Sequence, residues 1–179
     1  KVNGSSQNLN KINSWSPELF TKGHRNPQGM AINPITNEIW VNEHGPKGGD
    51  EINIIKLGRN YGWPIVTFGE EYWGGKVGQG ITTLEGFEDP IWYWVPSIAP
   101  SGMTFYNKNM FPEFKGNLLV SSLKFKSIYV VELKDGLPFK EKVLFKNRFG
   151  RIRDIEQLKD GSILIISDEK KGGLYKIYR

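Results

Sequence analysis

The chain has 179 residues, of which 38% are hydrophobic and 13% aromatic, so we expect one folded domain rather than a disordered chain. It contains no cysteine, which excludes disulfides, thiolate metal sites and cysteine nucleophiles. The net charge is +5, but the lysines are scattered, which favours a basic surface or a pocket for an anionic small molecule over nucleic-acid binding. No apolar run approaches the roughly 20 residues that cross a bilayer, so we predict no membrane span.

Two stretches lack the pattern of a regular strand. Residues 1–18 are polar, and we expect a connecting loop there. The chain opens with Lys1 rather than Met, as expected of a processed protein or a fragment. Residues 65–88 are rich in glycine, and we expect an irregular surface insertion within the domain.

The stretch 24–51 contains both histidines and the densest set of polar and backbone-bending residues. In the short strand at its centre, alternation predicts that Ile39 and Val41 point inward and Trp40 outward. The strand leads into the Gly-rich acidic loop Glu43–Glu51. Glycines there allow backbone groups to approach a ligand closely.

Short strands separated by turns fill the rest of the chain, and no segment has the 3.6-residue period of an amphipathic helix. The order strand, polar turn, strand, polar loop occurs three times, over 28–43, 101–122 and 153–168. The matching residues Gly116 and Gly161 are 45 positions apart, which is one blade period of a β-propeller. We therefore predict an all-β fold with about three propeller blades. The expected strands are Glu38–Asn42, Ile52–Leu57, Met103–Tyr106, Gly116–Ser121, Ser127–Leu133, Val143–Phe145, Ile152–Gln157, Ser162–Ser167 and Gly172–Tyr178.

Equivalent loops of successive blades reach one face around the central channel. The repeat therefore predicts that the cations Arg25, Lys124, Arg151 and Arg153 meet at a common mouth. Beside them we expect the carbonyls of Gly45–Pro46 and the carboxylates of Glu43, Asp50 and Glu51. Several guanidinium groups in one pocket indicate an anionic ligand with several carboxylates. Hard oxygen donors beside them suit calcium. For each cation alone, a surface ion-pair network is the competing interpretation.

Six motifs of the chain carry a family resemblance. They are GHRNPQGM (23–30), EHGPKGGDEIN (43–53), NYGWP (60–64), PSIAPSG (96–102), SSLK (121–124) and RIRD (151–154). In this order they resemble the soluble aldose sugar dehydrogenases that depend on pyrroloquinoline quinone (PQQ), the glucose/sorbosone dehydrogenase family. Such proteins are six-bladed β-propellers, usually exported to the periplasm, that oxidise the C1 hydroxyl of aldoses to lactones. The resemblance implies that residues 1–179 are the C-terminal half of such a propeller, with PQQ and Ca²⁺ as cofactors and a periplasmic or secreted location.

The resemblance also implies roles for individual residues. Arg25 would act on the substrate and quinone side, which makes it the catalytic candidate of this chain. The residues implied to bind PQQ are Arg25, Asn26, Lys124, Arg151 and Arg153. The residues implied to bind calcium are Gly45 and Pro46, whose carbonyls would ligate the ion that polarises the quinone, and Glu51 and Tyr61, which would belong to a second, structural site.

One part of the family pattern is missing. The general base of these enzymes is a histidine in the first half of the chain, which this sequence does not contain. Neither His24 nor His44 matches its motif, so we interpret His24 as a structural residue and His44 as a support for the calcium loop. Three blades would leave two apolar blade faces uncovered. We expect the missing N-terminal half, or a second copy related by a two-fold axis, to complete the propeller.

Two other functions remain open. The first is a non-catalytic calcium-binding propeller module that holds a glycan or a protein partner at the same mouth. The second is a lactonase-type hydrolase, which needs metal ligands from every blade, and for which only Asn26, Glu43 and Asp168 are candidates. The sequence assigns neither the sugar nor the electron acceptor. Residues that stack on the sugar and bind its hydroxyls would be shared between the missing half and loops such as Tyr72–Gly80.

Overall fold

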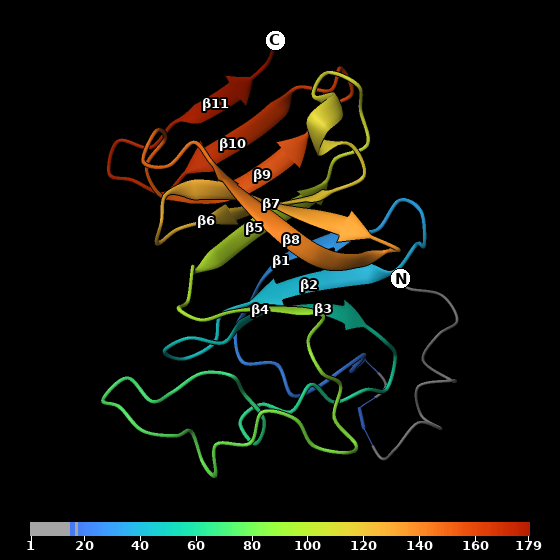
Figure 1. Ribbon diagram of the computed structural model, residues 1–179, viewed down its shortest axis with the longest axis vertical. Coiled ribbons are helices and arrows are strands. Elements are labelled where there is room, and N and C mark those ends of the chain that lie inside the picture. The colour runs from blue at the N-terminus through green and yellow to red at the C-terminus, as the bar shows by residue number, and fades with distance from the viewer. Residues whose placement is uncertain (1–14, 17) are drawn as a thin grey trace.

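The computed structural model describes residues 15–16 and 18–179, so the predicted connecting loop falls almost wholly outside the described residues. Three antiparallel sheets follow one another along the long axis of the molecule (Figure 1). Their strand orders are β1-β2-β3-β4, β5-β6-β7-β8 and β11-β10-β9. The strands are β1 (Pro27–Ile32), β2 (Ile39–Glu43), β3 (Asp50–Ile55), β4 (Trp92–Trp94), β5 (Pro100–Phe105), β6 (Leu118–Ser122), β7 (Ser127–Lys134), β8 (Leu137–Leu144), β9 (Ile152–Gln157), β10 (Ile163–Ser167) and β11 (Leu174–Ile177). Each sheet is one propeller blade, as the repeat predicted.

Strand β8 is longer than the predicted segment Val143–Phe145. It begins just after the turn Asp135-Gly136, where φ is +52° and +81°, as in the tight hairpin turns that Asp-Gly favours. Its edge position lets it carry alternating lysines and a proline, and the pairing register shifts where Pro138 meets Leu133. Because the apolar pattern of an edge strand is weak, the prediction missed residues 137–142 of this strand.

The first strands of the three sheets, β1, β5 and β9, pack side by side. Glycine permits this close approach. A Cβ on Gly29 would collide with the carbonyl oxygen of Ser101, and one on Gly102 with the side chain of Asp154. Hydrogen bonds cross the same contact, because Asn42 Nδ2 donates to Ser101 O at 2.7 Å and Ser101 Oγ donates to Ile152 O at 2.6 Å. The loops that precede these strands are thereby held together at the N-terminal ends of the three inner strands.

The first inter-sheet core corrects one prediction about side-chain direction. Trp40 is fully buried against the second sheet, and its ring meets Phe105 edge to face at 5.2 Å. Ile39 and Val41 are only half-buried. The predicted alternation was correct in period but assigned to the wrong faces, because the face that carries Trp40 is the one covered by the neighbouring blade.

Both end sheets present apolar side chains on their outer faces. On the first sheet, Met30 is 67% exposed and Ile32 is 58% exposed. On the third sheet, Ile166 and Leu174 face each other in register and are 46% and 64% exposed. These are the two uncovered blade faces expected of three blades from a larger ring.

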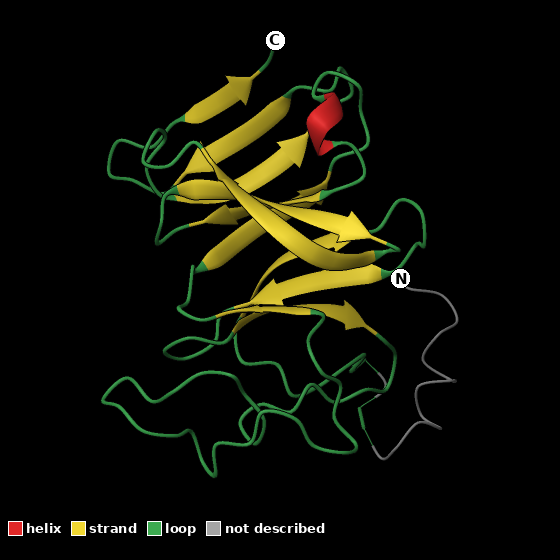
Figure 2. Ribbon diagram, viewed as in Figure 1, coloured by secondary structure: helices red, strands yellow, loops and turns green. Residues whose placement is uncertain are grey.

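The segment between β3 and β4 has no strand, as predicted for 65–88, and forms the large loop region of Figure 2. It is anchored by the buried side chains of Tyr61, Val66 and Val77. Backbone hydrogen bonds of 2.9 and 3.0 Å pair Glu70 with Lys47, which joins this insertion to the loop after β2. Among the described residues, no helix is long and apolar enough to cross a membrane.

Candidate functional site

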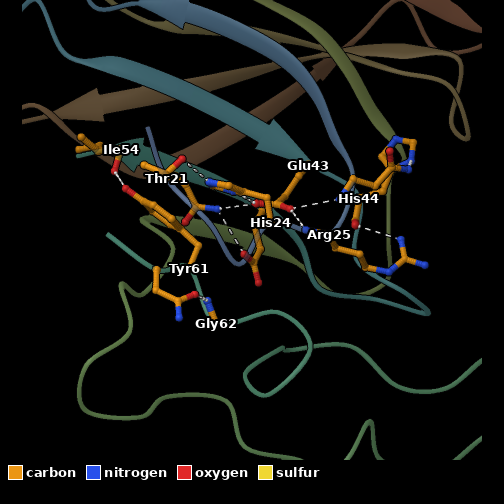
Figure 3. Close-up of polar contacts among 12 residues, drawn as sticks. Thr21, His24, Arg25, Glu43, His44, Ile54, Tyr61 and Gly62 are labelled. Atoms are coloured by element: carbon orange, nitrogen blue, oxygen red, sulfur yellow. Dashed lines mark hydrogen bonds and ion pairs between the residues drawn. The ribbon is translucent and has the colours of Figure 1, made fainter. Parts of the chain in front are cut away.

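Glu43, the last residue of β2, is the centre of the site and is 4% exposed. Its Oε2 accepts hydrogen bonds from the backbone N–H groups of Arg25 at 2.6 Å and Asn26 at 3.3 Å. Its Oε1 lies 2.9 Å from Nδ1 of His24 and accepts from Nδ2 of Asn53 at 3.2 Å (Figure 3). One buried carboxylate therefore fixes the turn that presents Arg25 and Asn26.

His24 and Tyr61 support this turn from behind. Their rings stack at 4.5 Å, and Nε2 of His24 lies 2.9 Å from Oγ1 of Thr21, so both ring nitrogens have partners. The Tyr61 hydroxyl donates to Ile54 O at 2.6 Å and accepts from the N–H of Lys56 at 2.9 Å. His24 thus has the structural surroundings that we expected. The Tyr61 hydroxyl is thus occupied by two backbone groups.

The side chain of Arg25 is held between the turn and the insertion. Its Nη1 donates to His44 O at 3.2 Å, and its Nη2 donates to the hydroxyl of Tyr72 at 3.3 Å. Its guanidinium carbon lies 5.2 Å from the centre of the Trp63 ring, within the range of a cation–π contact. These contacts fix the guanidinium and leave further N–H donors for a ligand.

A chain of hydrogen bonds joins the first and third blades across the mouth. Gln28 Nε2 donates to Asn26 Oδ1 at 2.8 Å, and Arg153 Nη1 donates to Gln28 Oε1 at 3.4 Å. Arg153 and Arg151 also contact Asp168, at 2.7 and 3.4 Å. The hydrogen bond from Arg153, aided by Arg151, lowers the pKa of Asp168. One carboxylate neutralises one of the two guanidiniums, so the pair keeps a net positive charge.

Lys124 lies near the start of the inner strand β5 but apart from this network. Its loop follows Ser122, which pairs with Pro100 at the start of β5. The Lys124 ammonium is exposed and lies 5.2 Å from the centre of the Phe125 ring. Among the described residues no carboxylate forms an ion pair with Lys124, whereas Arg151 and Arg153 share Asp168.

Three of the four predicted metal residues surround one small cavity. Gly45, Glu51 and Tyr61 line it together with Glu43, and its volume of about 10 Å³ is close to that of a single water-sized site. The fourth residue, Pro46, lines a larger cleft beside Arg25. The structure therefore brings Gly45, Glu51 and Tyr61 to one cavity and leaves Pro46 outside its lining.

The acidic groups around this cavity fit a cation. Burial raises the pKa of Glu51 to about 8, and the negative charges of Glu43 and Asp50 add to the effect. Asp50 is itself buried, and its carboxylate accepts from the N–H groups of Gly45 at 2.9 Å and Ala99 at 2.8 Å. No cluster of three acidic or histidine side chains forms a metal site among the described residues. Backbone carbonyls would therefore have to complete the coordination.

Sequence reasoning placed Glu43 and Asp50 at the mouth but did not identify their bonds to backbone N–H groups or the bridging role of Gln28. The motifs contained all three residues, but their roles depend on pairing between strands. Alternation along β2 and β3 offered one signal, because Glu43 pairs with Glu51 and both lie on the face that carries Asn53.

The three meandering blades and their cationic mouth define about half of a β-propeller, with a site suited to an anion next to a small acidic cavity. The family model described as Glucose / Sorbosone dehydrogenase matches residues 3–176, and the chain belongs to this family.

Individual relatives agree with this assignment. The chain is 42% identical over 161 residues to the aldose sugar dehydrogenase YliI of Escherichia coli K12. This alignment covers 89% of the chain and 43% of the relative. It is 27% identical over 225 residues to the quinoprotein glucose dehydrogenase B of Acinetobacter calcoaceticus. That alignment covers 92% of this chain and 45% of the relative. The apo crystal structure of the soluble aldose sugar dehydrogenase from Escherichia coli superposes with a TM-score of 0.87 at 41% identity, covering 92% of this chain and 48% of that one. The chain thus spans less than half the length of these relatives.

Proposed function

We propose that this chain supplies the cofactor-binding half of a PQQ- and calcium-dependent dehydrogenase that oxidises aldoses at C1 to lactones. The observation that carries the proposal is the network of Asn26, Gln28, Arg151 and Arg153, a cationic mouth next to a buried acidic cavity. The names of two relatives, an aldose sugar dehydrogenase and a quinoprotein glucose dehydrogenase, support it.

When bound, PQQ supplies the two-electron acceptor for the sugar. The protein would hold its carboxylates through Arg151 and Arg153, whose surplus charge and paired N–H donors suit carboxylate groups. Lys124 would add a third cation from the middle blade. Arg25, fixed by the carbonyl of His44, would orient the quinone and the substrate.

We assign calcium to two positions. The carbonyls of Gly45 and Pro46 would hold the ion that polarises the quinone. Glu51 and the carbonyl of Tyr61 would hold the structural ion, because their cavity is small, acidic and buried. In this arrangement the buried carboxylates would gain the counter-charge that they otherwise lack.

The proton acceptor would come from polypeptide outside this sequence. His24 has partners at both ring nitrogens, and Nε2 of His44 lies 2.6 Å from the carbonyl of Pro100. We therefore propose that the N-terminal half present in the relatives supplies the base and covers the open blade faces. A two-copy ring would complete the propeller without supplying that base. We further propose a periplasmic or secreted location and leave the electron acceptor unassigned.

Reconstitution tests the cofactor role. Adding PQQ and Ca²⁺ to the complete protein is expected to give a calcium-dependent change in quinone absorbance, which the double variant Arg151→Ala, Arg153→Ala abolishes. The matched control is Arg59→Ala with Arg179→Ala, since these arginines pair with glutamates outside the mouth. A change that survives the first double variant contradicts the proposal.

The alternatives give different outcomes. A non-catalytic module for a glycan or protein partner would show calcium-dependent binding without a quinone signal. A lactonase-type hydrolase would need free metal ligands at the mouth. Against it, Glu43 is occupied by backbone donors and Asp168 by two arginines.

A further inference from the structure

The loops around Arg151 carry a surplus of positive charge. Three connections reach this end of the second and third blades, from β6 to β7 (123–126), from β8 to β9 (145–151) and from β10 to β11 (168–173). They contain seven cations and two carboxylates, a surplus of five positive charges that equals the net charge of the whole chain. The cations are Lys124, Lys126, Lys146, Arg148, Arg151, Lys170 and Lys171, and the carboxylates are those of Asp168 and Glu169.

The opposite end of the same two blades is balanced in charge. Its connections run from β5 to β6 (106–117), from β7 to β8 (135–136) and from β9 to β10 (158–162), and they contain three cations and three carboxylates. The cations are Lys108, Lys115 and Lys159, and the carboxylates are those of Glu113, Asp135 and Asp160. Cations that are scattered along the sequence are therefore gathered by the fold at one end of these blades.

Hydrogen bonds join the three basic loops into one surface, which we call the basic patch. The backbone N–H of Asn147 donates to Lys126 O at 2.9 Å and so connects the first two loops. Glu169, in the third loop, contacts both of the others. Its Oε1 accepts from the backbone N–H of Arg151 at 2.9 Å and lies 3.9 Å from Nζ of Lys126. Gly150 permits this packing, because a Cβ there would collide with the Glu169 side chain.

Several cations of the basic patch are open to a partner. The exposed ones without a carboxylate partner among the described residues include Lys146, Lys170 and Lys171. The guanidinium carbon of Arg148 lies 5.8 Å from the centre of the Phe145 ring and 5.5 Å from that of the Phe149 ring. Arginine and aromatic side chains are enriched at protein interfaces. Because the cations are spread over three loops, the patch suits an extended negative surface.

Arg151 connects the basic patch with the cofactor mouth. Its guanidinium contacts Asp168 beside Arg153, while its backbone N–H bonds to Glu169 in the patch. A protein bound on the patch would therefore lie next to the proposed quinone. Oxidation of one aldose to its lactone removes two electrons and two protons from the sugar. In the proposed function both electrons pass to the quinone, and they have to leave before the next sugar is oxidised.

We infer that the basic patch docks an acidic protein that carries one electron at a time. Two molecules of this acceptor, each reduced by one electron, return the quinone to its oxidised form, and the two protons are released to water. Opposite charge steers such a partner to the patch and fixes its orientation beside the mouth. The inference rests on the proposed function for the source of the electrons.

The test uses plastocyanin, an acidic blue-copper protein, as the probe. Isothermal titration of the complete protein, loaded with PQQ and calcium, is expected to show binding at low ionic strength that weakens steeply with added salt. Cytochrome c, a basic haem protein that also carries one electron, is expected not to bind. A docking surface for a basic protein, or one without charge selectivity, would give the opposite result for cytochrome c and would overturn the inference.

Charge reversal locates the binding surface. The triple variant Lys146→Glu, Lys170→Glu, Lys171→Glu is expected to weaken plastocyanin binding about tenfold or more at low salt, and high salt should remove the difference. The matched control, Lys115→Glu, Lys134→Glu, Lys159→Glu, makes the same change of charge at exposed lysines of the opposite end and should alter binding less than about twofold. Equal effects of the two triple variants would overturn the inference.

Two further measurements separate the alternatives. Binding to phosphatidylserine vesicles without binding of plastocyanin would mean that the patch faces a membrane, and the inference would be wrong. Aldose-dependent reduction of a small neutral dye reads the dehydrogenase function alone. Dye reduction without plastocyanin binding would keep that function and reject the docking surface. Salt-sensitive plastocyanin binding without dye reduction would support the docking surface and reject the dehydrogenase function.

Discussion

Replacing Glu43 by Gln tests whether one buried carboxylate organises the site. Glu43 accepts four hydrogen bonds through two oxygens. The amide of Gln keeps only one acceptor oxygen, so about two of the four donors lose their partner. Hydrogen bonds to charged groups contribute about 1.5–3 kcal/mol each. We therefore expect Glu43→Gln to lower the free energy of unfolding by about 3 kcal/mol. Urea unfolding followed by tryptophan fluorescence measures this difference.

The matched control is Glu85→Gln, which changes an exposed carboxylate on the insertion. We expect it to alter the free energy of unfolding by less than about 0.5 kcal/mol. If Glu43→Gln is equally mild, the buried carboxylate does not hold the turn and the reasoning fails. At a urea concentration where the variant remains folded, we also expect weaker PQQ binding, because the Arg25 turn is no longer fixed.

Three further predictions concern pH and packing. The pKa of Glu51 is about 8 in the folded protein against an ordinary 4.5, so the stability it contributes is fully present below pH 4.5 and is lost as the pH rises toward 8. Calcium-free urea titrations from pH 5 to 8.5 measure the free energy of unfolding, which should fall by about 1.4 kcal/mol per pH unit in the wild type. Glu51→Gln should remove this fall. If the variant keeps the same dependence on pH, the raised pKa of Glu51 is not its cause. Gly102→Ala should cost about 1–3 kcal/mol, because its Cβ meets Asp154, and an unshifted thermal midpoint would exclude that clash. Tyr106→Phe removes a buried hydroxyl that donates to Gly161 O at 2.6 Å. It should lower the free energy of unfolding by about 1–3 kcal/mol and leave the quinone signal intact. Loss of that signal would contradict a purely structural role for Tyr106.

The all-β class and the three blades were predictable because the chain repeats a local pattern of strands and turns. Strands β9 and β10 fell within a residue of their predicted ends, since the core-facing isoleucines of both strands are buried in one core. Strand β4 was not assigned as a strand. Its three residues, Trp92–Trp94, form a strand by pairing with β3, across an insertion of more than thirty residues. No local pattern carries that information.

The direction of Trp40 was not predictable for a related reason. Alternation divides a strand into two faces but does not say which face a neighbouring sheet covers. In a propeller blade both faces can be covered, so the polarity contrast that usually identifies the inner face is weak. The indole of Trp40 meets Phe105, which lies 65 positions further along the chain.

The candidate site was predictable as a set of residues but not as a network. Short motifs located the cations and the acidic loop, because their spacing follows the blade repeat. The bridge from Asn26 through Gln28 to Arg153 depends on the close packing of three inner strands. Gly29 lets β1 approach β5, and Gly102 lets β5 approach β9. Such a contact between residues 125 positions apart requires the packed fold.

The separation of charge explains how a basic chain keeps buried acids at its site. Glu43 and Asp50 lie behind the mouth, where each binds backbone N–H groups of the loops that carry the candidate ligands. The cations Arg151 and Arg153 lie in front, and Asp168 partly neutralises them. Because burial strengthens electrostatic interactions, the rear acids favour a divalent cation while the front remains attractive to an anion. Calcium and quinone binding should therefore reinforce each other, and removing calcium should weaken PQQ binding even where no PQQ-contacting residue is changed.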